Sequence, residues 1–191
     1  MAARVVGLTG GIGSGKSEAL AAFGRHGAAT LSSDEVVRLL YERDDVRAAV
    51  SEHFGHEVVR EDGSIDRARI GERVFADPEE RSWLEGLLLP LVAAEFRAWR
   101  DRVLDSGAGL LVHEAPTLFE AGVEDRYDTI VMVTAPRELR EQRRPGAAGR
   151  MASQLPEEAK AARSDVVYEN TGTLDDLDRF VAELVRRLEK E

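Results

Sequence analysis

The chain has 191 residues, of which 43% are hydrophobic, so it can bury one core with a small insertion and requires no second independent domain. It contains no cysteine, which excludes disulfides, thiol catalysis and cysteine-ligated metal sites. The formal net charge of −10 disfavours a broad nucleic-acid surface, and we find neither a secretion signal nor a membrane-length apolar stretch, so we expect a cytoplasmic protein that binds neither nucleic acid nor membranes.

Short apolar runs alternate with helical patterns along the chain. This order is typical of an α/β fold in which helices cover both faces of a parallel sheet. The pattern predicts five strands in a mostly parallel sheet. They are expected at residues 5–8, 28–31, 110–113, 129–133 and 166–168.

A glycine-rich segment follows the first predicted strand. Residues 10–17 fit the pattern G-x-x-x-x-G-K-[ST] of the phosphate-binding loop, or P-loop. Glycines let such a loop turn tightly, so that its backbone N–H groups and the positive end of the next helix meet one polyphosphate. We expect Lys16 to reach the β- and γ-phosphates and the Ser17 hydroxyl to ligate Mg²⁺. The predicted nucleotide-binding residues are Gly11, Ile12, Gly13, Ser14, Gly15, Lys16, Ser17 and Glu18.

Helices are predicted between and after the strands. Ser32 or Ser33 can cap the second helix, and Thr173 can cap the last, whose apolar residues recur at helical spacing. The expected ranges of these helices are 15–25, 33–41 and 174–188.

The stretch between residues 44 and 106 has no strand of comparable length apart from a small hairpin at residues 58–63, so we interpret 44–106 as an insertion. Asp77 followed by Pro78 predicts the start of a helix, with the aspartate at the cap. Pro90 then predicts two helices or one kinked helix.

Other residues favour one class of P-loop protein. A GTPase would carry an Asn-Lys-x-Asp segment that reads guanine, but the chain has a single asparagine, Asn170, and Thr171 follows it. The chain is also short for a motor ATPase. We therefore favour a small-molecule kinase.

Several further segments resemble those of dephospho-coenzyme A kinases in order and spacing. Residues 8–17 are close to the family's opening, and Ser32-Ser33-Asp34 stands where the family usually has Asp-Ala-Asp. Residues 114–120 look like its Pro-Leu-Leu-Phe-Glu segment. Other similar positions are 54–55, 62–67, 74–85, Gln154, Lys160 and 165–172. The resemblance implies a kinase that uses ATP and Mg²⁺ to phosphorylate the ribose 3′-hydroxyl of dephospho-coenzyme A, giving coenzyme A and ADP.

The resemblance also implies how the single P-loop kinase domain is organised. The core would comprise residues 1–43 and 107–191, and the helical insertion at about 44–106 would hold the acceptor. A short lid at about 138–163 would close over the phosphates. Such a chain is expected to act on a small-molecule substrate as a monomer or weak homo-oligomer.

Asp34 is the predicted catalytic base, because it follows the second strand and matches the second acid of the family motif. Together with Lys16 it forms the predicted catalytic set. The alternative is that Asp34 only caps the helix that begins beside it.

Three further roles follow from the resemblance. Glu114, at the end of a buried strand, would hold the metal in the manner of a Walker-B acid, the alternative being a simple pair with an arginine. Thr9 and Leu118 are expected to contact the acceptor. The lid arginines that would reach the phosphates or the acceptor are Arg143, Arg144 and Arg150.

The chain departs from the family pattern at three places. Ser32 replaces the first acid, and Leu89-Pro90 stands where His-Pro is common, so no role is transferred to that histidine. Residues 142–150 are short for the lid, which predicts poorer exclusion of water and more ATP hydrolysis without acceptor. Two alternative functions remain, namely another P-loop nucleotide or sugar kinase and a nucleotide-binding regulator that has lost transfer.

Overall fold

The computed structural model describes residues 3–145 and 155–190. The chain divides into two compact units, one made of residues 1–33 with 99–191 and the other of residues 34–98. None of the described helices combines the length and apolar composition that crossing a membrane requires.

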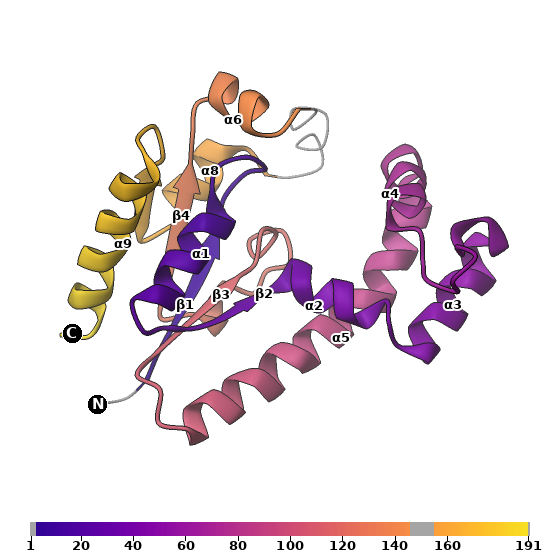
Figure 1. Ribbon diagram of the computed structural model, residues 1–191, viewed down its shortest axis with the longest axis horizontal. Coiled ribbons are helices and arrows are strands. Elements are labelled where there is room, and N and C mark those ends of the chain that lie inside the picture. Colours follow the sequence, from indigo (N-terminus) through magenta and orange to yellow (C-terminus); the bar gives the residue numbers. More distant parts are fainter. Residues whose placement is uncertain (1–2, 146–154, 191) are drawn as a thin grey trace. The chain divides into compact units, whose positions relative to one another are not determined.

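The first unit is built on a sheet with the strand order β2-β3-β1-β4-β5 (Figure 1). Each neighbouring pair of these strands is parallel, so the carboxyl ends of the five strands lie along one edge. The five predicted strands are confirmed within one residue at each end. They are β1 (Arg4–Thr9), β2 (Ala29–Ser32), β3 (Leu110–Glu114), β4 (Thr129–Thr134) and β5 (Val166–Glu169).

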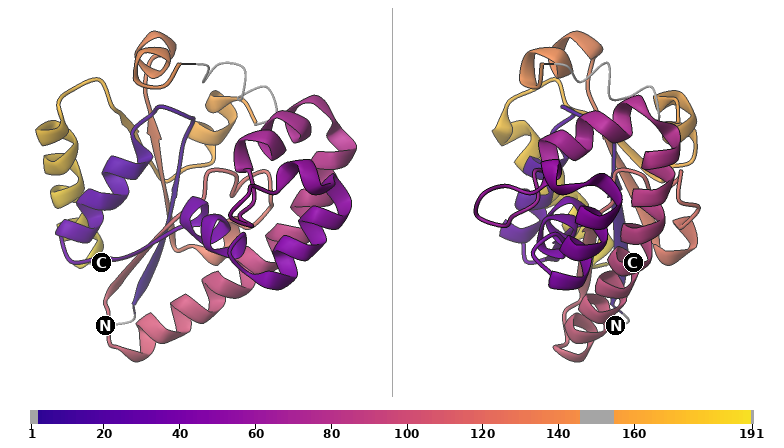
Figure 2. Two further views of the ribbon diagram at one scale, coloured as in Figure 1. Left: turned by 45° about the vertical axis from the view of Figure 1, so that its right-hand side comes forward. Right: turned by 90° about the vertical axis from the view of Figure 1, so that its right-hand side faces the viewer.

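Helices α1 (Lys16–Arg25) and α9 (Leu174–Leu188) cover one face of this sheet and lie side by side (Figures 1 and 2). Their apolar side chains pack with alternate residues of the central strands, such as Val6 and Leu8 of β1. Successive side chains of a strand leave opposite faces, so Gly7 belongs to the other face. A second apolar cluster contains Ala115, Leu118, Phe119 and Ile130.

Short helical elements lie in the connections before β4, after β4 and before β5. Thr173 caps α9, as predicted, by accepting a hydrogen bond from the main-chain nitrogen of Asp176 at 3.2 Å. The hydroxyls of Ser32 and Ser33, one of which is predicted to cap the second helix, are bonded to Glu114 and His113. Pro145 follows the end of one of these helices, as expected of a residue that cannot extend it. The short elements are η2 (Glu124–Arg126), α6 (Arg137–Arg143) and α8 (Glu157–Ala162).

The second unit is helical. Its elements are α2 (Ser33–Leu40), which starts at the boundary, α3 (Asp44–Phe54), η1 (His56–Val58), α4 (Arg67–Ala76) and most of α5 (Pro78–Asp105). Buried side chains along these helices include Val46, Val50, Phe54, Ile70, Leu88 and Phe96.

Three predictions made for the second unit can be compared with its structure. The carboxylate of Asp77 accepts a hydrogen bond from the main-chain nitrogen of Glu79 at 2.8 Å, which confirms the predicted start of α5. Pro90 lies inside this one helix and does not divide it. The predicted hairpin is reduced to a single antiparallel bridge between Val59 and Ile65.

Candidate active site

The loop between β1 and α1 has a backbone that favours glycine. Gly13 and Gly15 have φ values of +77° and +101°, in the left-handed region. A Cβ on Gly13 would lie 2.7 Å from the main-chain oxygen of Arg140, and one on Gly15 would lie 2.3 Å from Nδ2 of Asn170. Conformation and close packing both require glycine here, so the P-loop that the motif predicts is built as a tight turn.

Lys16 opens helix α1 and turns back over the loop. It is 8% exposed, and its Nζ donates a hydrogen bond to the main-chain oxygen of Gly11 at 3.0 Å. Ser17 and Glu18 follow in the exposed first turn of the helix. A buried cation, an exposed hydroxyl and the positive end of a ten-residue helix therefore meet at one point, which suits nucleotide phosphates and their metal ion.

Asn170 supports the P-loop from the connection that follows the edge strand of the sheet. It follows β5, is 5% exposed, and donates a hydrogen bond from Nδ2 to the main-chain oxygen of Ser14 at 2.8 Å. The two residues are 156 positions apart in sequence. No local sequence pattern around Asn170 indicates this contact.

Arg140 of α6 is a second support that the sequence pattern did not indicate. It is 6% exposed and forms an ion pair with Glu157 of α8, whose carboxylate also accepts a hydrogen bond from Oγ1 of Thr134 at 3.0 Å. A Cβ on Gly11 would lie 2.3 Å from Oε1 of Glu157 and 2.5 Å from Nη1 of Arg140. The paired carboxylate and guanidinium therefore lie together against the loop that would receive the phosphates.

The predicted lid arginines are only partly described. Arg143 is exposed, and its Nη1 lies 3.5 Å from the main-chain oxygen of Ser14, at the outer limit of a hydrogen bond. Arg144 is exposed. Arg150 lies outside the described residues, as does most of the segment 142–150. The lid roles of these arginines stay predictions.

Glu114 ends β3 beside the strand that leads into the P-loop. It pairs in register with Leu8 of β1 and is 3% exposed. The Ser32 hydroxyl donates a hydrogen bond to its Oε2 at 2.7 Å. Ser32, which replaces an acid of the family pattern, thus binds the carboxylate that we expect to serve the metal.

His113 precedes Glu114 and lies in a buried polar group. Its Nδ1 is 2.8 Å from the Tyr127 hydroxyl and its Nε2 is 2.9 Å from Oγ of Ser33. Burial, with a smaller contribution from the positive charge of Arg126, lowers the pKa of His113 to about 4. Burial raises the pKa of Tyr127 to about 12. The imidazole is therefore neutral near pH 7, as is the phenol.

Thr9 and Leu118, the predicted acceptor contacts, are buried. Oγ1 of Thr9 donates to the main-chain oxygen of Pro116 at 3.2 Å. The same oxygen accepts from Nζ of Lys160, which pairs with Glu120 at 2.7 Å. Leu118 is 1% exposed within the second apolar cluster. Both residues have packing partners within the first unit, and their contact with an acceptor stays a prediction.

Asp34, the predicted base, is the first residue of the second unit and directly follows Ser33. It is exposed and is the second residue of α2. It therefore lies inside the first turn of the helix and not at the cap position, which weakens the alternative of a purely capping role.

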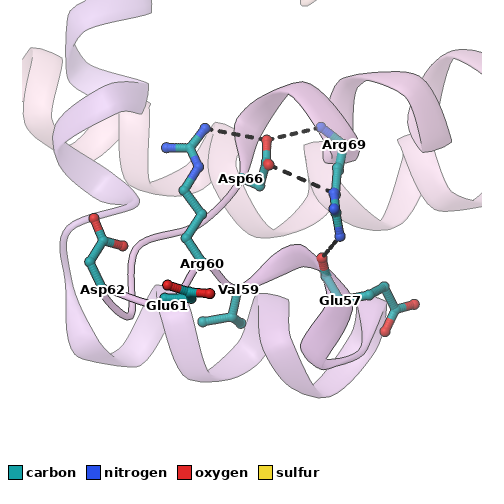
Figure 3. A pocket seen from close by; sticks show the side chains of 7 residues that line it. All are labelled: Glu57, Val59, Arg60, Glu61, Asp62, Asp66 and Arg69. Atoms are coloured by element: carbon teal, nitrogen blue, oxygen red, sulfur yellow. Dashed lines mark hydrogen bonds and ion pairs between the residues drawn. The ribbon is translucent and has the colours of Figure 1, made fainter.

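The second unit carries an open hollow of about 490 Å³ (Figure 3). Arg60 and Arg69 both contact Asp66, and Arg69 also donates to the main-chain oxygen of Glu57 at 2.6 Å. Four acids and two arginines line the hollow, so its formal charge disfavours an anionic ligand. Its lining residues are Glu57, Val59, Arg60, Glu61, Asp62, Asp66 and Arg69.

Comparison with known proteins identifies relatives along nearly the whole chain. The model of the family described as dephospho-CoA kinase matches residues 4–176. A dephospho-CoA kinase from Frankia casuarinae is 41% identical over 187 residues, which cover 94% of this chain and 81% of that protein.

Solved structures show the same fold. The structure of TT1252 from Thermus thermophilus superposes with a TM-score of 0.82 at 33% identity and covers 98% of this chain and 99% of its own. A dephospho-CoA kinase from Campylobacter jejuni has a TM-score of 0.72 at 22% identity, with 97% of both chains covered, which supports the fold alone.

The P-loop geometry yields a test with a matched glycine. We expect Gly13→Ala to weaken nucleotide binding at least about 10-fold, because the left-handed backbone costs a non-glycine residue about 1–2 kcal/mol and the new Cβ meets the oxygen of Arg140. Titration with a fluorescent ATP analogue measures this. Gly86→Ala is the control, since a Cβ there has no atom within 4 Å. Equal affinities of the two variants would contradict the close packing of the loop.

Proposed function

The chain belongs to the dephospho-CoA kinase family, and we propose that it transfers the γ-phosphoryl group of ATP to the ribose 3′-hydroxyl of dephospho-CoA, the last step of coenzyme A synthesis. The observation that carries this proposal is the family match over residues 4–176, which includes a P-loop built with the glycines and the lysine that its motif requires. A cytoplasmic location is part of the proposal and agrees with the lack of a membrane-crossing helix in the described segments.

The P-loop would bind the phosphates of ATP. Main-chain N–H groups of residues 11–17 and the start of α1 would surround them, as in other P-loops. Lys16 already lies over the loop, and its Nζ would exchange the bond with the Gly11 oxygen for one with phosphate. Arg140 lies at the same loop as an ion pair with Glu157. The charge of Lys16 would stabilise negative charge on the transferred group.

Mg²⁺ fits the oxygen groups at this edge of the sheet. An exposed hydroxyl at Ser17 and a buried carboxylate at Glu114 are the ligand types that Mg²⁺ prefers, together with phosphate oxygens and water. When bound, the ion would neutralise charge on the β- and γ-phosphates. The hydrogen bond from Ser32 would hold the Glu114 carboxylate in one orientation.

Asp34 would accept the proton of the attacking 3′-hydroxyl. A carboxylate is needed there because the hydroxyl must lose its proton as its oxygen bonds to phosphorus. Asp34 is exposed and lies two residues after the end of β2, at the edge where an α/β sheet binds its ligands. The acceptor would be held by the helical insertion.

The choice of acceptor is tested by ADP release with several alcohols. We expect dephospho-CoA to give the highest kcat/KM among dephospho-CoA, adenosine monophosphate, gluconate and shikimate. A preference for one of the other three would favour a different P-loop kinase. Nucleotide binding without turnover on any of them would favour the regulator.

The role of Asp34 is tested by Asp34→Asn. We expect transfer to fall about 100-fold or more, as for the loss of a general base, while the Kd of ATP stays unchanged. Glu35→Gln is the control, since Glu35 is the next residue of the same helix turn, is exposed and pairs with Arg38. Transfer at the unmodified rate in Asp34→Asn would remove Asp34 from this role.

The metal ligands are tested by Glu114→Gln, which keeps an oxygen that can accept the Ser32 hydrogen bond. We expect the Mg²⁺ concentration at half-maximal nucleotide binding to rise several-fold, because an amide oxygen is a weaker ligand than a carboxylate. Fluorescence titration of a nucleotide analogue against Mg²⁺ measures this without turnover. Glu183→Gln, an exposed position on α9, is the control. Superimposable Mg²⁺ curves for the two variants would exclude Glu114 from the metal site.

A further inference from the structure

Two consecutive serines at the end of β2 bind two consecutive residues at the end of β3. Ser32 donates to Glu114 at 2.7 Å, and Oγ of Ser33 lies 2.9 Å from Nε2 of His113. Successive side chains of β3 leave opposite faces of the sheet. The end of β2 is therefore held from both faces, by a carboxylate on one side and an imidazole on the other.

Tyr127 contacts the second nitrogen of the imidazole, the one that Ser33 does not contact. Its hydroxyl lies 2.8 Å from Nδ1 of His113. Its ring covers Gly7 of β1, because a Cβ on Gly7 would lie 2.9 Å from Cγ of the ring. Gly7 pairs in register with His113, so the phenol ring occupies the place of a missing side chain beside the histidine. A glycine in the middle of a buried strand is explained by this close approach.

The group Tyr127–His113–Ser33 is a continuous hydrogen-bonded chain. A neutral imidazole has one nitrogen that donates and one that accepts, so both of its nitrogens are used by the two hydroxyls. His113 is 4% exposed, so its ring is largely shielded from water. Hydrogen bonds in such surroundings restrict side-chain position more than exposed ones do.

We propose that His113 and Tyr127 are positioning residues for phosphoryl transfer, which hold Ser33 and thereby fix the point at which the chain turns from β2 into α2, directly before Asp34. The inference rests on the proposed role of Asp34. Neither residue touches the reacting atoms. Their effect is on alignment of the carboxylate with the acceptor hydroxyl, to which transfer is steeply sensitive, since a displacement of about 1 Å can cost about 100-fold.

Tyr127→Phe tests the proposal by removing one hydroxyl and keeping the ring over Gly7. We expect kcat to fall about 5- to 10-fold, a part of the cost of misplacement, with the KM of ATP unchanged because the P-loop contacts stay intact. Tyr168→Phe is the matched control: its ring stacks on Phe180 in β5 and α9, outside the chain of hydrogen bonds. A fall of similar size in both variants, or none in Tyr127→Phe, would overturn the proposal.

Two substitutions of His113 separate its two contacts. The amide of glutamine can reach the place of Nε2 and keep the bond to Ser33, whereas that of asparagine reaches only the place of Nδ1 and keeps the bond to Tyr127. We expect His113→Gln to retain more of kcat than His113→Asn, with thermal unfolding curves confirming that both are folded. The reverse order would overturn the proposal, because it would make the Ser33 contact dispensable.

A double-variant comparison distinguishes positioning from general destabilisation. In an Asp34→Asn background, Tyr127→Phe should lower the residual transfer rate by less than 2-fold, because the carboxylate that it helps to place is gone. The same factor in both backgrounds would overturn the positioning role and leave Asp34 as the base. Unchanged transfer in Asp34→Asn alone would instead remove the proposed base, and the positioning role with it.

Discussion

The P-loop depends on a backbone that cannot carry side chains at several of its positions. Gly13 and Gly15 adopt left-handed conformations, and the space beside them is filled by Arg140 and Asn170. The constraint works in both directions: glycine permits the turn, and the close approach of neighbouring elements then holds it. The loop is thus prepared for a polyphosphate before one arrives, so less ordering is needed on binding.

Preparation of this kind explains how a chain of net charge −10 can bind a polyanion. Lys16 is 8% exposed and Arg140 is 6% exposed, and both lie against the loop. Partial burial makes the charge of Lys16 act more strongly on a nearby phosphate than a surface charge does, whereas the charge of Arg140 is paired with Glu157. The ion pair of Arg140 with Glu157 also joins α6 to α8, the two described helices of the predicted lid, at the point where the phosphates would bind. The acidity of the outer surface therefore says little about this site.

The sequence predicts what depends on local pattern and misses what depends on contacts between distant segments. The five strands, the P-loop and the caps at Asp77 and Thr173 follow from periodicity and from the residues that turns and helix ends require. The contact of Asn170 with Ser14 joins positions 156 apart, and no local rule predicts it. The single glycine in β1 is a local signal of the Tyr127 contact. Gly7 stands in a buried strand, where a missing side chain indicates close approach by another group.

Ser32 shows how a departure from the family pattern can preserve a site. An aspartate at this position would place a second carboxylate beside the buried Glu114, and two like charges at hydrogen-bond distance disfavour ionisation of both unless a cation lies between them. The serine hydroxyl donates a hydrogen bond to the Glu114 carboxylate instead. The chain thereby has one charged group fewer beside Glu114 and keeps that carboxylate oriented. The neighbouring Ser33 makes the corresponding bond to His113 on the other face, so the replacement of Asp-Ala by Ser-Ser supplies both hydroxyls that fasten the end of β2.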